Sequence, residues 1–171
     1  TCSIRDKAAH KVDSFLGEME LKKKDQPDLI LGVAGCYAKQ EGKMLLNRFR
    51  QIDFIMGPDA IENVSSMVLD VEMNGNKLIE TQFSTDPRFS YSLPMVSNMF
   101  TALVPIIKGC NHFCTFCIVP FLRGREKSRD VTDVINEVKH LCENQGVQEV
   151  MLVGQNVCSF GKRKNDFVQL I

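Results

Sequence analysis

Three cysteines close together in the sequence, Cys110, Cys114 and Cys117, are the residues best suited to metal chemistry in this chain. Thiolates at these spacings can wrap one four-iron cluster, because the short spacers let a single loop bring the sulfurs to three corners of it. The fourth iron then has no cysteine ligand. An open coordination position separates a catalytic metal site from a closed structural one, so the spacing predicts a cluster that binds a further ligand.

Two other kinds of site use cysteines in this way. A zinc site built on Cys-x-x-Cys needs a fourth ligand, and His112 lies inside the loop with poor reach. An electron-transfer ferredoxin normally shows a fourth cysteine nearby. The additional Cys110 at its offset and Phe116 just before the last cysteine favour the catalytic cluster over both alternatives.

The remaining cysteines lie near the ends of predicted elements. Cys2 precedes a predicted helix and Cys36 follows a predicted strand, so both could meet at one edge of the first domain, although each alone is most often a buried thiol. Cys142 is assigned to the apolar face of a helix, and Cys158 follows a strand. We expect these last two to be packing thiols rather than ligands.

Composition sets broad limits on the class of protein. The 21 acidic and 21 basic residues balance, so any nucleic-acid contact must come from a local basic patch. No apolar run approaches the roughly 20 residues that span a bilayer, and the first residues are charged, so we expect an intracellular protein without a membrane segment. Seven cysteines are then more consistent with metal ligands or buried thiols than with disulfides.

The apolar pattern predicts alternating helices and strands in the first half. Apolar residues at helical spacing predict a helix over residues 4–24, and an apolar run over residues 28–34 predicts a buried strand. A helix at 43–50, a strand at 52–56 and a helix after Pro58 continue the alternation. This order is typical of a parallel α/β sheet.

The second half repeats the pattern after a polar stretch rich in turn signals. A strand at 102–107 leads into the cysteine loop, and a helix at 131–142 and a strand at 149–154 follow, which is how a (β/α) barrel begins. The chain starts without Met and stops where a helix opens, so we expect a part of a longer protein. The expected divisions are a first domain at 1–75, a linker at 76–98 and a second domain at 99–171.

Three segments resemble the methylthiotransferase family of radical S-adenosylmethionine (SAM) enzymes. They are residues 1–8 (TCSIRDKA), residues 35–42 (GCYAKQEG) and residues 110–129, which begin with CNHFCTFC and end with RGREKSR. The resemblance covers essentially the whole chain. It implies an α/β fold, with an amino-terminal α/β methylthiotransferase domain followed by the start of a radical SAM (β/α) barrel.

The same resemblance implies two 4Fe-4S clusters. Cys110, Cys114 and Cys117 would hold the cluster that binds SAM. Cys2 and Cys36 would be the second and third ligands of an auxiliary cluster, whose first ligand would precede Thr1 in sequence.

Further residues are expected to touch SAM or the substrate. Phe116 is expected at the SAM adenine, although a buried loop aromatic would look the same, and Gly154 and Gln155 at the SAM methionine end. Basic residues after the loop would touch tRNA phosphate or the SAM carboxylate, unless they form a solvated charged turn. These basic residues are Arg123, Arg125, Lys127 and Arg129.

The residues of the matching segments are most similar to those of the MiaB branch. That branch adds a methylthio group to carbon 2 of N6-isopentenyl adenosine beside the anticodon. A radical is needed there, because an adenine C–H bond has no useful acidity for a general base. Branches acting on threonylcarbamoyl adenosine in tRNA or on a ribosomal-protein aspartate, and a non-catalytic iron–sulfur redox module, remain alternatives. The expected partners are tRNA and an electron donor such as flavodoxin or ferredoxin, and we expect a cytoplasmic monomer.

Overall fold

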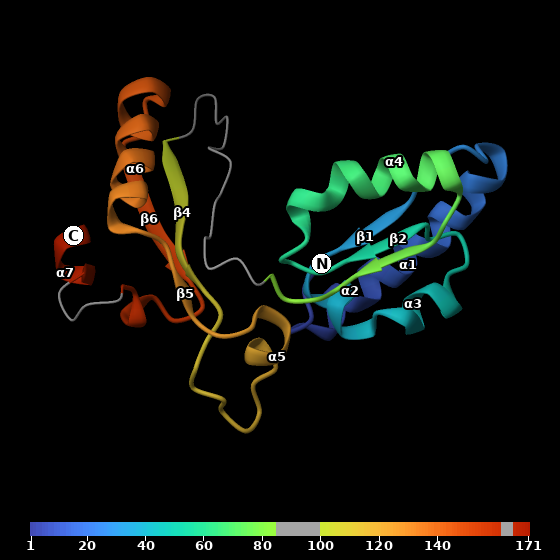
Figure 1. The fold of residues 1–171 in the computed structure, drawn as a ribbon, viewed down its shortest axis with the longest axis horizontal. Helices are drawn as coiled ribbons and strands as arrows, with labels where there is room; N and C mark the ends of the chain where they lie inside the picture. The colour runs from blue at the N-terminus through green and yellow to red at the C-terminus, as the bar shows by residue number, and fades with distance from the viewer. Residues whose placement is uncertain (85–99, 162–165) are drawn as a thin grey trace. The chain divides into compact units, whose positions relative to one another are not determined.

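The computed structural model describes residues 1–84, 100–161 and 166–171, and its order of helices and strands can be followed in Figure 1. The chain divides into two compact units, Thr1–Ser84 and Thr85–Ile171. Among the described residues, every helix is too short or too polar to cross a membrane.

A parallel three-stranded sheet forms the centre of the first unit. Its strands are β1 (Gly32–Ala34), β2 (Phe54–Met56) and β3 (Leu78–Glu80), and β2 lies in the middle. Parallel neighbours must be joined by crossover connections, usually helices. The mixed α/β fold expected from the sequence is confirmed.

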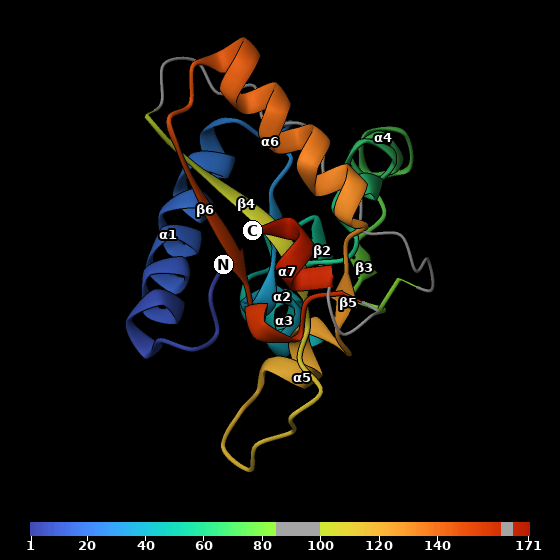
Figure 2. The same cartoon turned by 90° about the vertical axis from the view of Figure 1, so that its left-hand side faces the viewer.

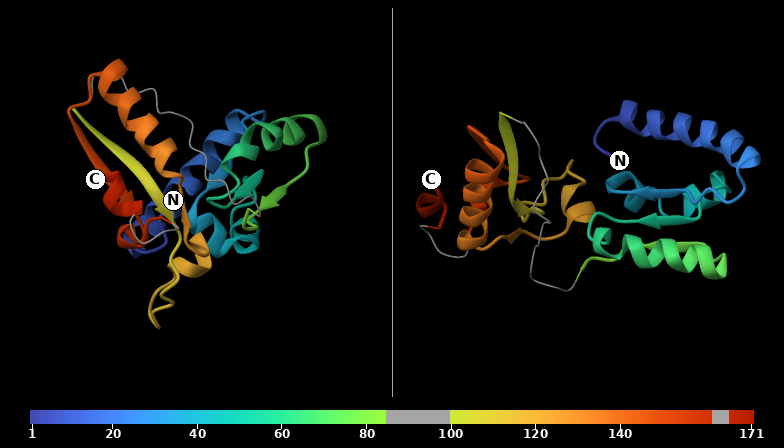
Figure 3. Two further views of the ribbon diagram at one scale, coloured as in Figure 1. Left: turned by 60° about the vertical axis from the view of Figure 1, so that its left-hand side comes forward. Right: turned by 90° about the horizontal axis from the view of Figure 1, so that it is seen from above.

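Helices cover both faces of this sheet. The right-hand view of Figure 3 shows α1 (Asp6–Asp25) on one face and α4 (Val64–Asn74) on the other. Three shorter elements complete the unit. They are α2 (Cys36–Glu41), α3 (Lys43–Arg48) and the 3-10 turn η1 (Ile61–Asn63).

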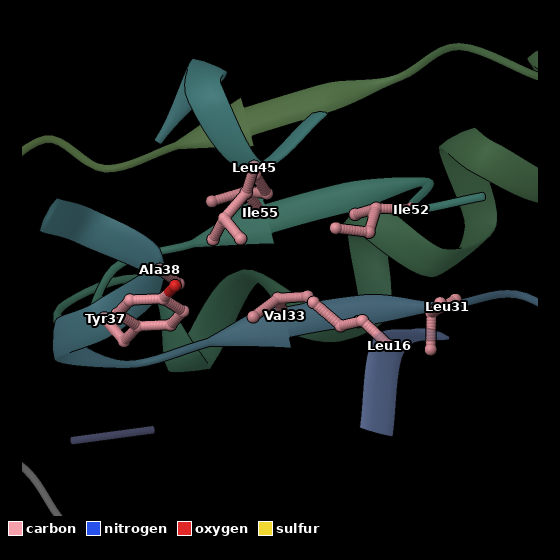
Figure 4. Packing of buried hydrophobic residues seen from close by; sticks show 8 residues of the cluster. All are labelled: Leu16, Leu31, Val33, Tyr37, Ala38, Leu45, Ile52 and Ile55. Atoms are coloured by element: carbon pink, nitrogen blue, oxygen red, sulfur yellow. The ribbon is translucent and has the colours of Figure 1, made fainter. Parts of the chain in front are cut away.

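The core of the first unit has one layer on each face of the sheet, because successive strand residues point to opposite faces. Ile55 packs in the layer that contains Leu16 of α1 (Figure 4). Its neighbours Phe54 and Met56 pack in the other layer, with Met67 of α4. Burial on both faces explains why the strands read as continuous apolar runs.

The second unit contains a sheet in the order β5-β4-β6. β4 (Thr101–Lys108) pairs in parallel with β6 (Glu149–Gly154), while the short β5 (Lys127–Ser128) is antiparallel to β4. Helix α6 (Val131–Gln145), which lies alongside these strands in Figure 2, connects β5 to β6. Strand, loop, helix and strand therefore follow the order expected for the start of a barrel.

Helix α6 has well-defined ends and a buried apolar face. The Asp130 carboxylate accepts a 2.9 Å hydrogen bond from the Thr132 N–H, and Gly146 closes the helix in a left-handed conformation. Val134 and Leu141 are fully buried against the sheet. Three short elements complete this unit: α5 (Val119–Arg123), the 3-10 turn η2 (Val157–Ser159) and α7 (Asp166–Leu170).

Several expectations differ from the structure. The expected linker at 76–98 begins with β3, which pairs with β2, and its residues 85–98 lie outside the described residues. Cys142 is exposed, so its assignment to the core was wrong: Leu141 takes the inward position, and the next residue lies about 100° further around the helix. Cys158 is also exposed, on η2, and is not a packing thiol.

Candidate functional site

The cysteine loop begins where β4 ends and faces the end of β6. Because β4 and β6 are parallel, their carboxyl ends lie at the same edge of the sheet. Gln155, the first residue after β6, reaches this loop, and its Oε1 accepts a 2.6 Å hydrogen bond from the Gly109 N–H. The residue expected near SAM is therefore in contact with the start of the cysteine loop.

The backbone around Cys110 is tightly held. Gly109 has a φ of +79°, and a β carbon there would lie 2.2 Å from the Arg125 carbonyl oxygen, so only glycine fits. The Cys110 N–H donates to the Gly124 carbonyl at 3.1 Å. Gly154 is also required, since a β carbon would lie 2.5 Å from Ile107 Cγ2, at an irregular step between the strands.

A network of polar side chains fastens the loop beyond Cys110. The Glu126 carboxylate accepts hydrogen bonds from the Asn111 N–H at 3.2 Å and from Asn111 Nδ2 at 3.3 Å. Asn156, which follows Gln155, donates from Nδ2 to Glu126 Oε1 at 2.9 Å and contacts His112 Nε2 at 3.0 Å. The loop is thus joined to two other segments of the unit.

The three loop thiols have the chemistry that an iron–sulfur cluster requires. Cys110 and Cys117 are half-buried, Cys114 is exposed, and all three are free of disulfides. A turn brings the Cys117 N–H to the Cys114 carbonyl at 2.9 Å, immediately before α5. Three thiolates from one loop suit iron–sulfur binding rather than the oxygen ligands of Mg²⁺ or Ca²⁺. These residues fit the implied group.

Aromatic side chains of the loop take two different positions. Phe116 is 92% exposed, so it is not the buried loop aromatic that the sequence also allowed. Phe113 packs edge-on against Phe121, with ring centroids 6.1 Å apart, and the Arg125 guanidinium lies 4.3 Å from the Phe113 ring centre. Arg125 therefore has a partner within the loop region.

Arg129 is buried and holds parts of the second unit together. It is 9% exposed, and its Nη1 donates to the Pro105 carbonyl at 3.1 Å and lies 2.5 Å from Glu137 Oε2. The Glu137 side chain is buried as well. The pair joins the segment after β5 to α6, and Arg129 is not a candidate for phosphate or SAM contact in this arrangement.

The structure brings the Cys2 and Cys36 segments together at the carboxyl edge of the first sheet. Thr1 Oγ1 donates to the Ala34 carbonyl at 2.7 Å, and the Cys36 N–H donates to the Thr1 carbonyl at 3.2 Å. Cys2 is exposed and Cys36 is half-buried. The backbone N–H of Ile4, with a smaller effect of Arg5, lowers the pKa of the Cys2 thiol and so favours the thiolate, the metal-binding form.

Side chains next to Cys36 anchor its helix. The Tyr37 hydroxyl donates to Asp13 Oδ1 of α1 at 2.9 Å, and Arg48 Nη2 of α3 donates to the same oxygen at 2.6 Å. Burial raises the pKa of Tyr37, which keeps its hydroxyl protonated as a donor. The position of Cys36 is therefore set by α1 and α3.

Some residues of the site were missed in the sequence. Asn111, Glu126 and Asn156 fix the loop. His112, expected to have poor reach, is close enough to Cys110 and Glu126 for their ligand atoms to lie within 4.8 Å of one another. One signal was present, since Asn156 follows Gln155 directly after a strand parallel to β4. The contact of Glu126 with Asn111 had no such signal, because it depends on β5 folding back along β4.

Sequence comparisons with known proteins give one family match in each unit. Residues 1–57 match the family model described as Uncharacterized protein family UPF0004, and residues 104–166 match that of the Radical SAM superfamily. The second match contains the whole cysteine loop and the end of β6. A radical SAM domain implies an iron–sulfur cluster and SAM as cofactors.

Curated relatives match nearly the whole chain. It is 43% identical, over 97% of its length, to the tRNA-2-methylthio-N(6)-dimethylallyladenosine synthase of Vesicomyosocius okutanii. Enzymes of the same name from Buchnera aphidicola and Neisseria meningitidis serogroup A are 40% and 39% identical over 95% and 97% of the chain. The chain spans 37% of the length of each of these relatives. With both family models in order along it and these identities over nearly its whole length, the chain is MiaB-like, matching part of the radical SAM methylthiotransferases.

Proposed function

We propose that this chain forms the amino-terminal domain and the start of the barrel of a tRNA-modifying enzyme. The enzyme would add a methylthio group to carbon 2 of N6-isopentenyl adenosine beside the anticodon. The observation that carries the proposal is the cysteine loop at the carboxyl end of β4, fixed to Gln155 at the end of β6. The names of the curated relatives support the choice of substrate.

Cys110, Cys114 and Cys117 would hold the SAM-binding 4Fe-4S cluster, and Cys2 and Cys36 would hold part of an auxiliary one. When bound, the first cluster supplies the electron for reductive SAM cleavage, which begins the radical chemistry. A flavodoxin or ferredoxin would deliver that electron. The two sets of thiols lie in different units, each at the carboxyl edge of its own sheet.

The remaining loop residues divide between binding and positioning. Phe116, exposed between two ligands, is available to stack on the SAM adenine. Gln155 positions the loop by holding the Gly109 N–H, and Gly154 lets the strand ends approach closely. Arg123 and Arg125 would meet tRNA phosphate, and Arg129 is left out because it is buried with Glu137.

The test is chemical analysis of tRNA. The full-length protein that carries this chain, produced in a strain lacking its own methylthiotransferase, should convert N6-isopentenyl adenosine in tRNA to its 2-methylthio form. Mass spectrometry of digested tRNA detects the added methylthio group. Methylthiolation of threonylcarbamoyl adenosine instead would reassign the branch, and unmodified tRNA from cells with iron-loaded protein would contradict the proposal.

A further inference from the structure

The cysteine loop carries a second set of metal ligands that differs from its three thiols. Cys110, His112 and Glu126 each offer one ligand atom, and these atoms all lie within 4.8 Å of one another. Among the described residues this is the one group of three cysteine, histidine or acidic side chains that lie so close. It combines a thiol, an imidazole and a carboxylate.

Two of the three ligand groups already face one shared partner. Asn156 Nδ2 lies 3.0 Å from His112 Nε2 and 2.9 Å from Glu126 Oε1, so both acceptors face the same amide nitrogen, which a bound metal ion would displace. The Cys110 N–H donates to the Gly124 carbonyl, which fixes the backbone at the third ligand. Around a tetrahedral zinc ion, bonds of about 2.0–2.3 Å place ligand atoms roughly 3–4 Å apart. The three ligand atoms here lie within 4.8 Å of one another, and His112 is exposed, so its side chain has room to turn toward a bound ion.

Charge and ligand type favour a divalent transition metal. A Cys110 thiolate and the Glu126 carboxylate together carry two negative charges, and neutral His112 adds a nitrogen donor, so a divalent cation is balanced. Zinc accepts sulfur, nitrogen and oxygen ligands in one site, and three protein ligands leave its fourth position for water. Affinity for such a site rises from Fe²⁺ through Co²⁺ to Zn²⁺ or Cu²⁺.

We propose that, in the cluster-free protein, Cys110, His112 and Glu126 form a mononuclear site for Zn²⁺ or a similar divalent transition metal. Binding forms the metal–sulfur bond and releases the Cys110 thiol proton to solvent. Because Cys110 is shared, the bound ion and the three-cysteine cluster exclude one another. This consequence rests on the proposed function, whereas the ion site itself does not.

The test uses the reduced, metal-free chain with Cys2 and Cys36 replaced by serine, so that the first unit adds no thiolate among the described residues. Titration with Co²⁺, followed by its thiolate charge-transfer absorption and then displaced by Zn²⁺, gives the stoichiometry and affinity. One equivalent should bind. Removing a residue that only hydrogen-bonds to a metal ligand lowers metal affinity about 10–100-fold. His112 and Glu126 are proposed as ligands themselves, so His112→Ala and Glu126→Gln should each weaken binding at least about tenfold.

Three further variants decide between this site and a zinc ion held by the loop thiols. Cys114→Ser and Cys117→Ser should keep the affinity, as should His140→Ala, which removes a histidine on α6 bonded to Asn144. The proposal is overturned if no ion binds, if the two serine variants lose the ion while the His112 and Glu126 variants keep it, or if all four weaken alike. Neither cluster nor SAM is present in this titration, so absence of the ion site would not count against the proposed enzyme activity. Absence of the enzyme activity would likewise not count against the ion site.

Discussion

A β carbon added to Gly109 would lie 2.2 Å from the carbonyl oxygen of Arg125. This close approach brings the two ends of the cysteine loop together, since Gly109 precedes Cys110 and Arg125 follows α5. The same glycine donates its N–H to Gln155, so one backbone position links three segments at the carboxyl edge of the second sheet.

Replacing Gly109 should lower the free energy of unfolding by more than backbone strain alone would. Gly146 has a similar φ of +70° but has nothing within 4 Å of an added β carbon, which makes Gly146→Ala a matched control. A left-handed conformation costs an alanine about 1–2 kcal/mol. Gly109→Ala should lower the free energy of unfolding by roughly 1–3 kcal/mol more than Gly146→Ala does, because its β carbon overlaps the Arg125 carbonyl. Urea unfolding measures both, and equal losses would show that the Arg125 contact does not constrain the loop.

Breaking the buried pair of Arg129 and Glu137 should destabilise the second unit. Glu137→Ala leaves the Arg129 guanidinium buried without its carboxylate, which costs about 3–5 kcal/mol. Glu143→Ala removes an exposed carboxylate from the same helix and should change the free energy of unfolding by less than about 0.5 kcal/mol. Thermal and urea unfolding compare the two. A similar small change in both would mean that the stability of the unit does not depend on the Arg129–Glu137 pair.

The exposed cysteines should be replaceable. Cys142→Ser and Cys158→Ser each exchange one exposed polar atom for another, so the free energy of unfolding should change by less than about 0.5 kcal/mol. Iron and acid-labile sulfide, measured on the reconstituted full-length protein, should stay at the level of the unmodified protein. Loss of a cluster's worth of iron from either variant would place that cysteine among the ligands.

The two clusters should be separable by substitution in the first unit. Cys2→Ala or Cys36→Ala, in the full-length protein, should spare SAM cleavage and prevent methylthiolation, because these thiols belong to a different unit from the loop. The yields of deoxyadenosine and of modified tRNA are compared on one sample. Equal loss of both yields, in a variant whose circular dichroism is unchanged, would argue against a separate auxiliary cluster.

The longer elements could be predicted from the sequence because their apolar periodicity is strong. The helix expected at 4–24 is α1, and the strand expected at 102–107 is β4. Short elements carry little pattern of their own, so α2, α5 and β5 were missed, whereas α3 and β2 were predicted because they continue the alternation of helices and strands. Cys142 was placed in the core because the apolar face predicted for this helix is wider than the side that the structure buries. Glu137 lies on that buried side, where it pairs with Arg129.

The spacing of the loop cysteines makes them candidate ligands in the sequence, whereas the contacts that hold their loop could not be predicted. The contacts of Gln155 with Gly109 and of Asn156 with Glu126 join residues 30 to 46 positions apart. Such contacts arise from the pairing of β4 with β5 and β6, which no local pattern encodes. The same holds for His112, whose place beside Cys110 depends on how the loop folds.

Reductive SAM cleavage by loop-cysteine variants shows whether Cys110, Cys114 and Cys117 hold the SAM-binding cluster. The full-length protein with Cys110, Cys114 and Cys117 all replaced by alanine is reconstituted with iron and sulfide without oxygen, and given SAM and dithionite. Deoxyadenosine is then measured beside unmodified protein and a Cys142→Ser, Cys158→Ser control. The triple variant should form none and lose one cluster's iron, while the control cleaves SAM normally. Cleavage by the triple variant at the unmodified rate would contradict the assignment of these three cysteines.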